Sequence, residues 1–249
     1  MNNDEDLKKG IRVENIANWY FRLNGFLSIP SCIIHLDKNE AGRVRAGDNR
    51  IAKTEADLIG VRFQGSNEKI DFKGKLSDDT CLLGIDDLPE STIALFILVE
   101  VKSGVCRMNG PWSKRENKNM QRVIRRLGFS PDDEVETVAI AMYTNGKWKD
   151  EKFVFQYICV GGRKSPELTE SYPDLIQIDW DDIGKFLCKR FTQASDEKIP
   201  SGKIHEQWPD FGQKYGRWFV NNRQRSEETS VCAVKNYIES GQLITRNVR

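Results

Sequence analysis

The sequence predicts an α/β fold in which helices flank a central mixed β-sheet, with a mainly helical extension at the C-terminus. The apolar run from Ile93 to Val99 is typical of a strand buried on both faces. Segments with a helical apolar repeat precede and follow this run. Beyond residue 191 the chain is rich in aromatic residues punctuated by Pro and Gly. We therefore expect a core over residues 1–191, with a polar insertion at about 64–91, and an extension over residues 192–249.

Bulk composition limits the classes of protein to consider. The chain has 249 residues and a formal net charge of +1, so affinity for a polyanion must come from local clustering of charge. No apolar run is long enough to cross a bilayer, and the first residues are acidic and polar, unlike a secretory signal. We expect a soluble, cytoplasmic protein without a membrane partner.

Cysteine and histidine usage disfavours several kinds of site. The six cysteines are scattered without a Cys-x-x-Cys pair, so neither a zinc site nor a disulfide framework is expected. The two histidines, His35 and His205, have no partner at metal-ligand spacing. Histidine-dependent nucleases and serine or cysteine triads are disfavoured for the same reason.

The first element expected is a helix from Asp4 to Asn24, ended by Gly25. At 100° per residue, Leu7 and Phe21 belong to one apolar arc, and Glu14 falls inside it. Two interpretations of Glu14 stand at this point. Its carboxylate faces inward toward a site, or it lies at the edge of the arc and reaches solvent or an arginine.

Three strands follow the helix, over Phe26–Leu36, Thr54–Phe63 and the run that ends at Lys102. Side chains two positions apart in a strand lie on the same face, so Glu100 and Lys102 are neighbours. Because an unpaired buried charge costs several kcal/mol, this pair must compensate itself or serve a ligand. Strands also commonly end in charged surface residues, so a second acid is needed to support a site. Asp57, in the preceding strand, is that acid.

Asp57 in one strand and Glu100-Val101-Lys102 at the end of the next resemble the motif of the PD-(D/E)XK nuclease superfamily. This superfamily includes restriction endonucleases and Holliday-junction resolvases. The resemblance covers about residues 5–190 through a handful of motif residues. Ala56-Asp57 stands where the motif has Pro-Asp, and we ascribe the long separation of Asp57 from Glu100 to the insertion.

The resemblance implies a restriction-endonuclease-like core and a cofactor, Mg²⁺, for which Mn²⁺ can substitute. It implies that Asp57 and Glu100 hold the metal with the main-chain carbonyl of Val101, and that Lys102 assists the attacking water. Many members place a glutamate on the first helix beside the metal site, so an inward Glu14 would hold the waters of a second metal. Glu55 shares the strand face of Asp57 and is a reserve ligand.

A basic helix is expected from Ser113 to Leu127, ended by Gly128. From Lys102 to Gly128, both included, there are eight basic residues and one acid. We expect this concentration to contact nucleic-acid phosphates, the alternative being a solvated helix face. The residues concerned are Lys114, Arg115, Lys118, Arg122, Arg125 and Arg126.

Gln121 lies on the flank of the same helix. Some branches of the superfamily carry a glutamine there that approaches the active site. No tyrosine follows Gln121 at the matching spacing, so a surface glutamine is the alternative.

The remaining elements are a hairpin, a strand and two helices. Residues Thr137–Tyr143 and Phe153–Val160 are expected to be paired strands that turn at Asn145-Gly146. A short strand at Leu175–Ile178 then precedes a helix that Asp179 caps and that runs to about residue 191. The last helix is expected over residues 226–239, and the C-terminal segment should pack against the core.

These features predict a Mg²⁺-dependent endonuclease that hydrolyses phosphodiester bonds of DNA, with DNA as partner and a homodimer as one option. No nucleotide cofactor is expected. The alternatives are a catalytically inactive nucleic-acid-binding or assembly module of the same fold, and a glycosidase that uses two carboxylates. Glycoside hydrolysis gives no role to Lys102. The sequence leaves open DNA against RNA, and duplex against junction or single strand.

Overall fold

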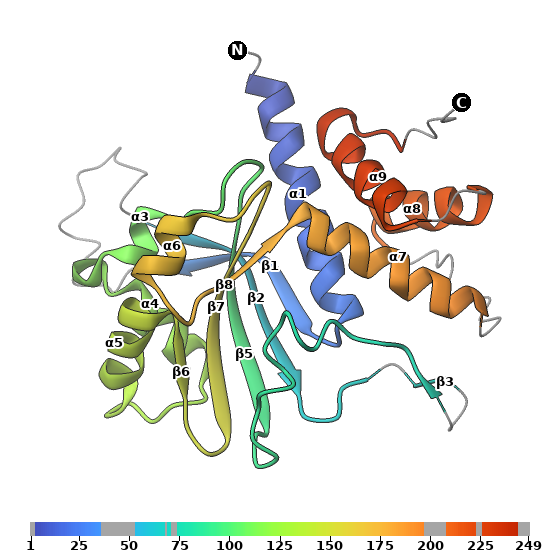
Figure 1. Ribbon diagram of the computed structural model, residues 1–249. Helices are drawn as coiled ribbons and strands as arrows, with labels where there is room; N and C mark the ends of the chain where they lie inside the picture. The colour runs from blue at the N-terminus through green and yellow to red at the C-terminus, as the bar shows by residue number, and fades with distance from the viewer. Residues whose placement is uncertain are drawn as a thin grey trace.

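The computed structural model describes residues 3–35, 53–67, 69–70, 74–196, 208–222 and 226–243. Its centre is a mixed sheet of six strands in the order β1-β2-β5-β7-β6, with β8 also paired to β7 (Figure 1). Strand β2 is antiparallel to both of its neighbours, β1 and β5, whereas β5, β7 and β8 run parallel. The strands span Leu27–His35 (β1), Lys53–Phe63 (β2), Ala94–Val101 (β5), Lys147–Lys149 (β6), Phe153–Gly161 (β7) and Ile176–Asp179 (β8).

Helices cover both faces of the sheet, as the sequence predicts (Figure 1). One face carries α1 (Asn3–Leu23), α7 (Trp180–Asp196), α8 (Asp210–Asn221) and α9 (Glu227–Ser240). The other face carries α4 (Asn119–Leu127) and α5 (Val135–Asn145), with the short helices α3 (Gly110–Ser113) and α6 (Pro166–Ser171) beside them.

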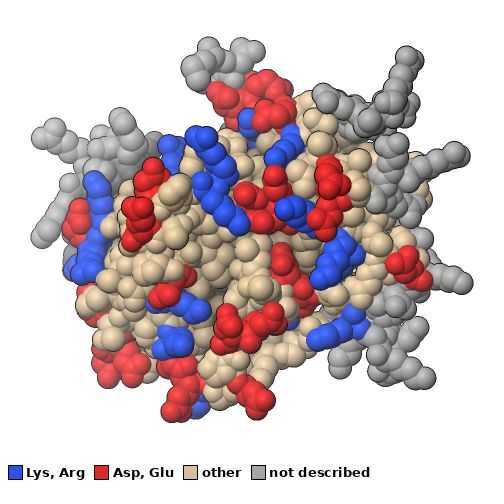
Figure 2. Space-filling model, viewed as in Figure 1, with Lys and Arg blue, Asp and Glu red and all other residues tan. Residues whose placement is uncertain are grey.

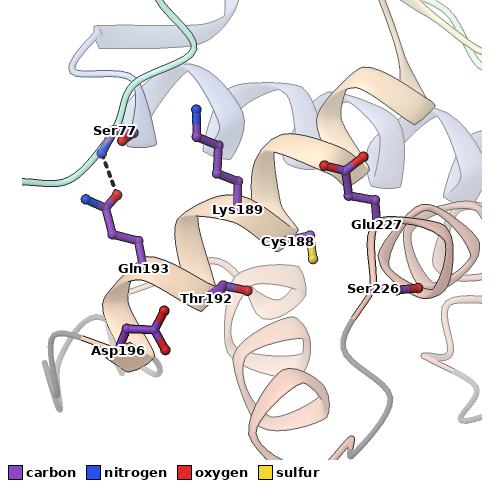
Figure 3. Close-up of a pocket in the computed structure, with 8 residues that line it drawn as sticks. All are labelled: Ser77, Cys188, Lys189, Thr192, Gln193, Asp196, Ser226 and Glu227. Atoms are coloured by element: carbon purple, nitrogen blue, oxygen red, sulfur yellow. Dashed lines mark hydrogen bonds between the residues drawn. The ribbon is translucent and has the colours of Figure 1, made fainter.

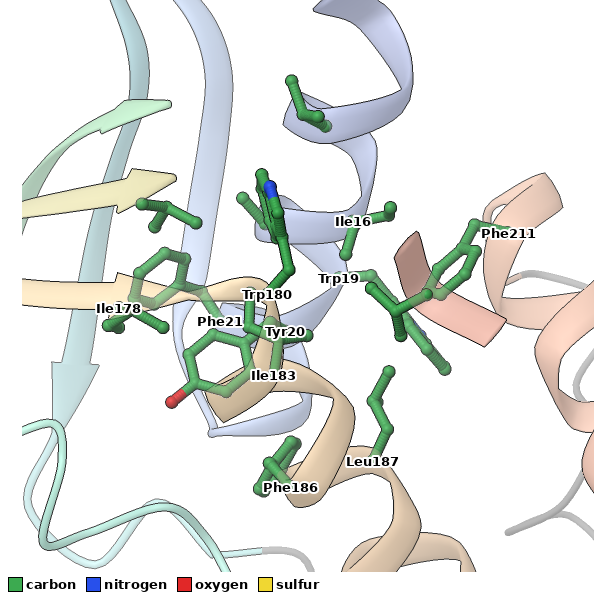
Figure 4. Packing of buried hydrophobic residues seen from close by; sticks show 14 of the residues in the cluster. Ile16, Trp19, Tyr20, Phe21, Ile178, Trp180, Ile183, Phe186, Leu187 and Phe211 are labelled. Atoms are coloured by element: carbon green, nitrogen blue, oxygen red, sulfur yellow. The ribbon is translucent and has the colours of Figure 1, made fainter. Parts of the chain in front are cut away.

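An aromatic core joins α1 to the C-terminal helices. Trp19 is 1 % exposed and makes edge-on ring contacts with Phe211 of α8 (Figure 4) and with Phe191 of α7. The described helices of the C-terminal segment, α8 and α9, bury their apolar residues in the same cluster as α1 and α7. Such aromatic packing removes a large apolar area from water and fixes α1 across the sheet.

A buried ion network ties the polar insertion to the core. Asp78 accepts hydrogen bonds from Arg62 of β2 at 2.9 Å and from Arg190 of α7 at 3.3 Å. All three side chains are at most 6 % exposed, so the one carboxylate offsets part of the charge of two buried guanidinium groups. The insertion also contains a two-stranded hairpin, β3 (Lys69–Ile70) and β4 (Gly74–Lys75).

The expectation of one continuous helix over residues 113–127 is wrong in its first half. A 3₁₀ turn, η1 (Arg115–Asn117), and a left-handed residue, Lys118 (φ 50°), separate α3 from α4. The side-chain amide of Asn119 donates to the Pro111 carbonyl at 2.9 Å. This bond folds the chain back on itself, so the helical repeat begins only at residue 119.

The expected strand at 137–143 is also wrong, because these residues belong to α5. Val135, Val138, Ala139 and Met142 are buried at helical spacing, and they pack on the sheet. Gly146 (φ 78°) ends the helix as a left-handed cap instead of forming a hairpin turn. The other predicted elements are confirmed, including β7, β8 and α9.

Candidate active site

Asp57 and Glu100 lie side by side on neighbouring strands. The β2–β5 ladder ends at the pair Leu58↔Val99, so one step further along the register Asp57 comes opposite Glu100. Beyond the ladder, the main-chain amide of Val101 donates to Oδ2 of Asp57 at 2.7 Å. The strand that carries Glu100 therefore also fixes the Asp57 carboxylate.

Lys102 bridges the two carboxylates. Its Nζ donates a hydrogen bond to Oε1 of Glu100 and lies 3.9 Å from Oδ2 of Asp57. Glu100 is 1 % exposed, whereas the Asp57 and Lys102 side chains are 17 % and 16 % exposed. Asp57 and Lys102 thus form the accessible rim of the site, and Glu100 forms its buried floor.

Glu14 on α1 is half-buried, and the charges that act on it come from the two strands. Partial burial and the negative charges of Asp57 and Glu55 raise the pKa of the Glu14 carboxyl from 4.5 to about 7, against the opposing charge of Lys102. Asp57 therefore acts electrostatically on both Glu14 and Glu100.

The pKa of Glu100 is raised from 4.5 to about 7, chiefly by burial and then by the charge of Asp57. Burial also raises the pKa of Asp57, although the Val101 amide opposes that shift. Like charges gathered in a low-dielectric site repel one another, so a cation placed among them would favour their ionised forms.

The donor set fits a hard cation that keeps its water. Among the residues that the structure describes, no group of three or more His, Cys, Asp or Glu side chains stands as a metal cage. Mg²⁺ is bound by one or two carboxylates and several waters, so Asp57 and Glu100 suffice. Because the N–H and C=O of one residue project to the same edge of a strand, the Val101 carbonyl lies on the Asp57 side.

Two further residues of this neighbourhood were missed by the sequence analysis. Asn109 donates from its side-chain amide to Oε1 of Glu100, and the positive charge of Arg107 lowers the pKa of Glu100. Both lie in the loop after β5, within nine residues of Glu100. Only their closeness to Glu100 in the sequence could have indicated a role, because loops have no periodicity from which a contact can be predicted.

Backbone strain lies next to Asp57. The β1–β2 ladder pairs Pro30 with Leu58 and Cys32 with Ala56, but it skips Ser31 opposite Asp57. Ser31 is left-handed (φ 50°), a conformation that is unfavourable for residues other than glycine. Strain of this kind is concentrated at functional sites.

The two reserve residues differ in their relation to the carboxylate pair. Glu55 is exposed on β2, and its negative charge raises the pKa of Asp57. Gln121 is buried, donates to Glu136 and accepts from the hydroxyl of Tyr143, both on α5. These hydrogen bonds direct Gln121 to α5 and not to the carboxylates.

The predicted basic surface is divided. Arg122 is 7 % exposed and donates from Nη1 to the Asn117 carbonyl at 2.6 Å and to Oδ1 of Asn119 at 2.9 Å. It therefore braces the turn before α4, and little of its side chain is exposed. The other five basic side chains are exposed: Lys114, Arg115, Lys118, Arg125 and Arg126.

Charges of both signs are mixed on the face seen in Figure 2, which shows no broad basic surface over the described residues. Away from the carboxylates, an open cavity of about 510 Å³ lies between α7 and the start of α9 (Figure 3). Lys189, Asp196 and Glu227 line it, and it includes none of the predicted site residues.

Comparison of the chain with protein-family models, with curated proteins and with solved structures found no match. No helix within the described residues is long and apolar enough to cross a membrane.

Proposed function

We propose that this protein is a metal-dependent endonuclease of the PD-(D/E)XK type, which hydrolyses phosphodiester bonds of DNA. The observation that carries the proposal is the position of Lys102. Its amine contacts Glu100 and stands 3.9 Å from the Asp57 carboxylate, so a pair of carboxylates suited to a cation and a charged donor share one site. Glycoside hydrolysis uses two carboxylates and gives no role to an amine between them.

The order and direction of the elements support this assignment. A helix, three antiparallel strands, further helices and a strand parallel to the third follow one another along the chain. The helix followed by three strands is the order that the resemblance implies for a restriction-endonuclease-like core. Asp57 and Glu100 stand on the second and third of these strands, as the motif requires.

Asp57, Glu100 and the Val101 carbonyl would hold Mg²⁺, with Mn²⁺ as a substitute. When bound, the cation polarises the phosphodiester, lowers the pKa of a water ligand and neutralises charge in the transition state. The hydrogen bond from Val101 keeps Asp57 in place before substrate arrives, so the site needs little reorganisation.

Lys102 and Glu14 would act on the attacking water and the phosphate. The Nζ of Lys102 donates hydrogen bonds toward the water and toward the phosphate oxygen that gains charge. Glu14, whose pKa is about 7, is suited to accept the proton of that water near neutral pH. The products would carry 5′-phosphate and 3′-hydroxyl ends.

Cleavage of supercoiled plasmid with Mg²⁺ or Mn²⁺ tests the proposal. Wild type should nick or linearise the DNA, and ligase should reseal the nicks. Glu100→Ala and Lys102→Ala should each lower the rate by at least about 100-fold. Lys149→Ala, at an exposed lysine of β6, is the control and should cut like wild type. Equal cutting by wild type and both site variants, or no cutting by any of them, would contradict the proposal.

One observation favours a second candidate, a non-catalytic nucleic-acid-binding module of the same fold. Lys102 and Asn109 already satisfy Oε1 of Glu100, so the carboxylate is compensated without a metal. Calorimetry separates the two candidates. DNA binding without uptake of Mg²⁺ or Mn²⁺ would support the module, whereas metal uptake that Asp57→Ala abolishes would support the nuclease.

A further inference from the structure

Asn109 occupies a position where asparagine normally caps a helix. It is the N-cap residue of α3, with extended backbone angles (φ −72°, ψ 149°). Asparagine is among the preferred residues there, because its side-chain oxygen can accept from the free amides of the first turn. The Asn109 side chain makes no such bond. Its amide nitrogen donates to Oε1 of Glu100 instead.

The direction of this hydrogen bond follows from chemistry. A carboxylate only accepts hydrogen bonds, so the Nδ2 side of the amide, and not the Oδ1 side, must face Glu100. Nine residues separate Asn109 from Glu100, and the loop must fold back to bring them together. Asn109 therefore lacks the capping hydrogen bond that its position favours and binds the buried carboxylate of Glu100 instead. Departures from local conformational preference are common at functional sites.

Both described hydrogen-bond donors to the Glu100 carboxylate contact the same oxygen atom. Within the described residues, the amine of Lys102 and the amide of Asn109 both donate to Oε1. This arrangement fixes the rotation of the carboxylate and leaves Oε2 as the oxygen available for a cation. Lys102 projects from the same strand, whereas Asn109 reaches Glu100 from the loop, so the carboxylate is held from two directions.

We propose that Asn109 is a positioning residue, whose side-chain amide holds Glu100 so that Oε2 meets the cation shared with Asp57. The inference rests on the proposed nuclease function and adds to it a residue outside the superfamily motif. Partners that hydrogen-bond to metal ligands typically contribute about 10- to 100-fold to metal affinity or activity.

Serine separates positioning from helix capping. Serine is as good an N-cap as asparagine, but its hydroxyl is too short to reach the place where the amide meets Glu100. If Asn109 matters only as a cap, Asn109→Ser keeps wild-type behaviour and Asn109→Ala loses stability. If Asn109 positions Glu100, both variants lose function. Asn117→Ser, at an exposed asparagine in η1, is the matched control.

The experiment measures Mn²⁺ binding by calorimetry, plasmid cleavage at saturating Mn²⁺ and the melting temperature of each variant. We expect Asn109→Ser to weaken Mn²⁺ binding by about 10-fold or more and to lower kcat, with an unchanged KM for DNA and an unchanged Tm. Mn²⁺ binding and cleavage equal to wild type in Asn109→Ser would overturn the role of Asn109 alone. Losses that follow a parallel fall in Tm would overturn it too. A wild-type protein that neither binds Mn²⁺ nor cuts DNA would overturn both this inference and the proposed function.

Discussion

The main-chain amide of Val101 donates a 2.7 Å hydrogen bond to Oδ2 of Asp57. The bond forms where the β2–β5 ladder has ended, so a side chain takes the place of the next main-chain acceptor. The strand that supplies Glu100 and Lys102 thereby also orients Asp57. One short stretch of β5 organises every group that we propose to act on the phosphodiester, apart from Glu14.

Asp57 and Glu55 lie on one strand, and substitution distinguishes their roles. Asp57→Asn should abolish Mn²⁺ binding and lower cleavage by at least about 100-fold, because the amide removes a charged ligand beside the Val101 bond. Glu55→Gln should stay within about threefold of wild type, because Glu55 is exposed and acts on the site only through its charge. Calorimetry and plasmid cleavage measure both effects. The reverse ranking would make Glu55 the ligand.

The raised pKa of Glu14 should make the stability of the metal-free protein depend on pH. Its pKa rises from 4.5 in the unfolded chain to about 7 in the folded protein, so the folded state binds the proton more tightly. The resulting stabilisation is fully present below about pH 4.5 and is lost as the pH rises to about 7. Urea unfolding across this range should therefore show falling stability in wild type.

Glu14→Gln cannot ionise, so its stability should fall less over the same range. The control is Asp6→Asn, at an exposed acid on the same helix, which should retain the wild-type slope. Glu100 titrates in the same window and keeps part of the slope in Glu14→Gln. Identical slopes in wild type and Glu14→Gln would contradict the placement of Glu14 beside the other carboxylates.

The sequence predicted those parts of the site that depend on local geometry. Glu100 and Lys102 lie two residues apart at the end of an apolar run, and strand alternation alone makes them neighbours. Helical periodicity placed Glu14 in an apolar arc. Asn109 could not be predicted, because its contact with Glu100 depends on how a loop without periodicity folds back.

The errors in the predicted fold have a common cause. Periodicity was extended across residues where tertiary contacts change the conformation. Residues 137–143 contain β-branched and aromatic residues typical of strands, yet packing against the sheet makes them helical. A helix that begins at residue 113 would carry Arg122 on its outer face. The left-handed Lys118 interrupts that helix, so the helical repeat begins again after it and Arg122 points inward.

Ser31 should store strain opposite Asp57. Its left-handed backbone costs a residue with a Cβ about 1–2 kcal/mol. Ser31→Gly should raise the free energy of unfolding by about 0.5–1 kcal/mol, after the greater backbone entropy of glycine is subtracted. Lys118→Gly, at the same φ but outside the site, should be stabilised similarly. Chemical denaturation measures both, and lower stability in Ser31→Gly would contradict the strain.

Arg122 and Arg126 lie one helical turn apart, and the structure predicts opposite consequences of their removal. Arg122 is buried and its hydrogen bonds to Asn117 and Asn119 hold the turn before α4. Hydrogen bonds from a charged group contribute about 1.5–3 kcal/mol, so Arg122→Ala should lower the free energy of unfolding by about that amount. Its affinity for DNA, measured below the melting transition, should stay close to that of wild type.

Arg126→Ala should show the converse, because Arg126 is exposed on the last turn of α4. Its melting temperature should match wild type. A lysine or arginine that contacts one phosphate releases about one counterion, so the slope of log K against log salt should become shallower by about 1. Fluorescence anisotropy across a salt series, together with thermal unfolding, measures both variants. The opposite result would be a shallower slope in Arg122→Ala and an unchanged slope in Arg126→Ala. It would mean that Arg122 turns outward on binding, and that the exposed basic residues of α4 do not contact DNA.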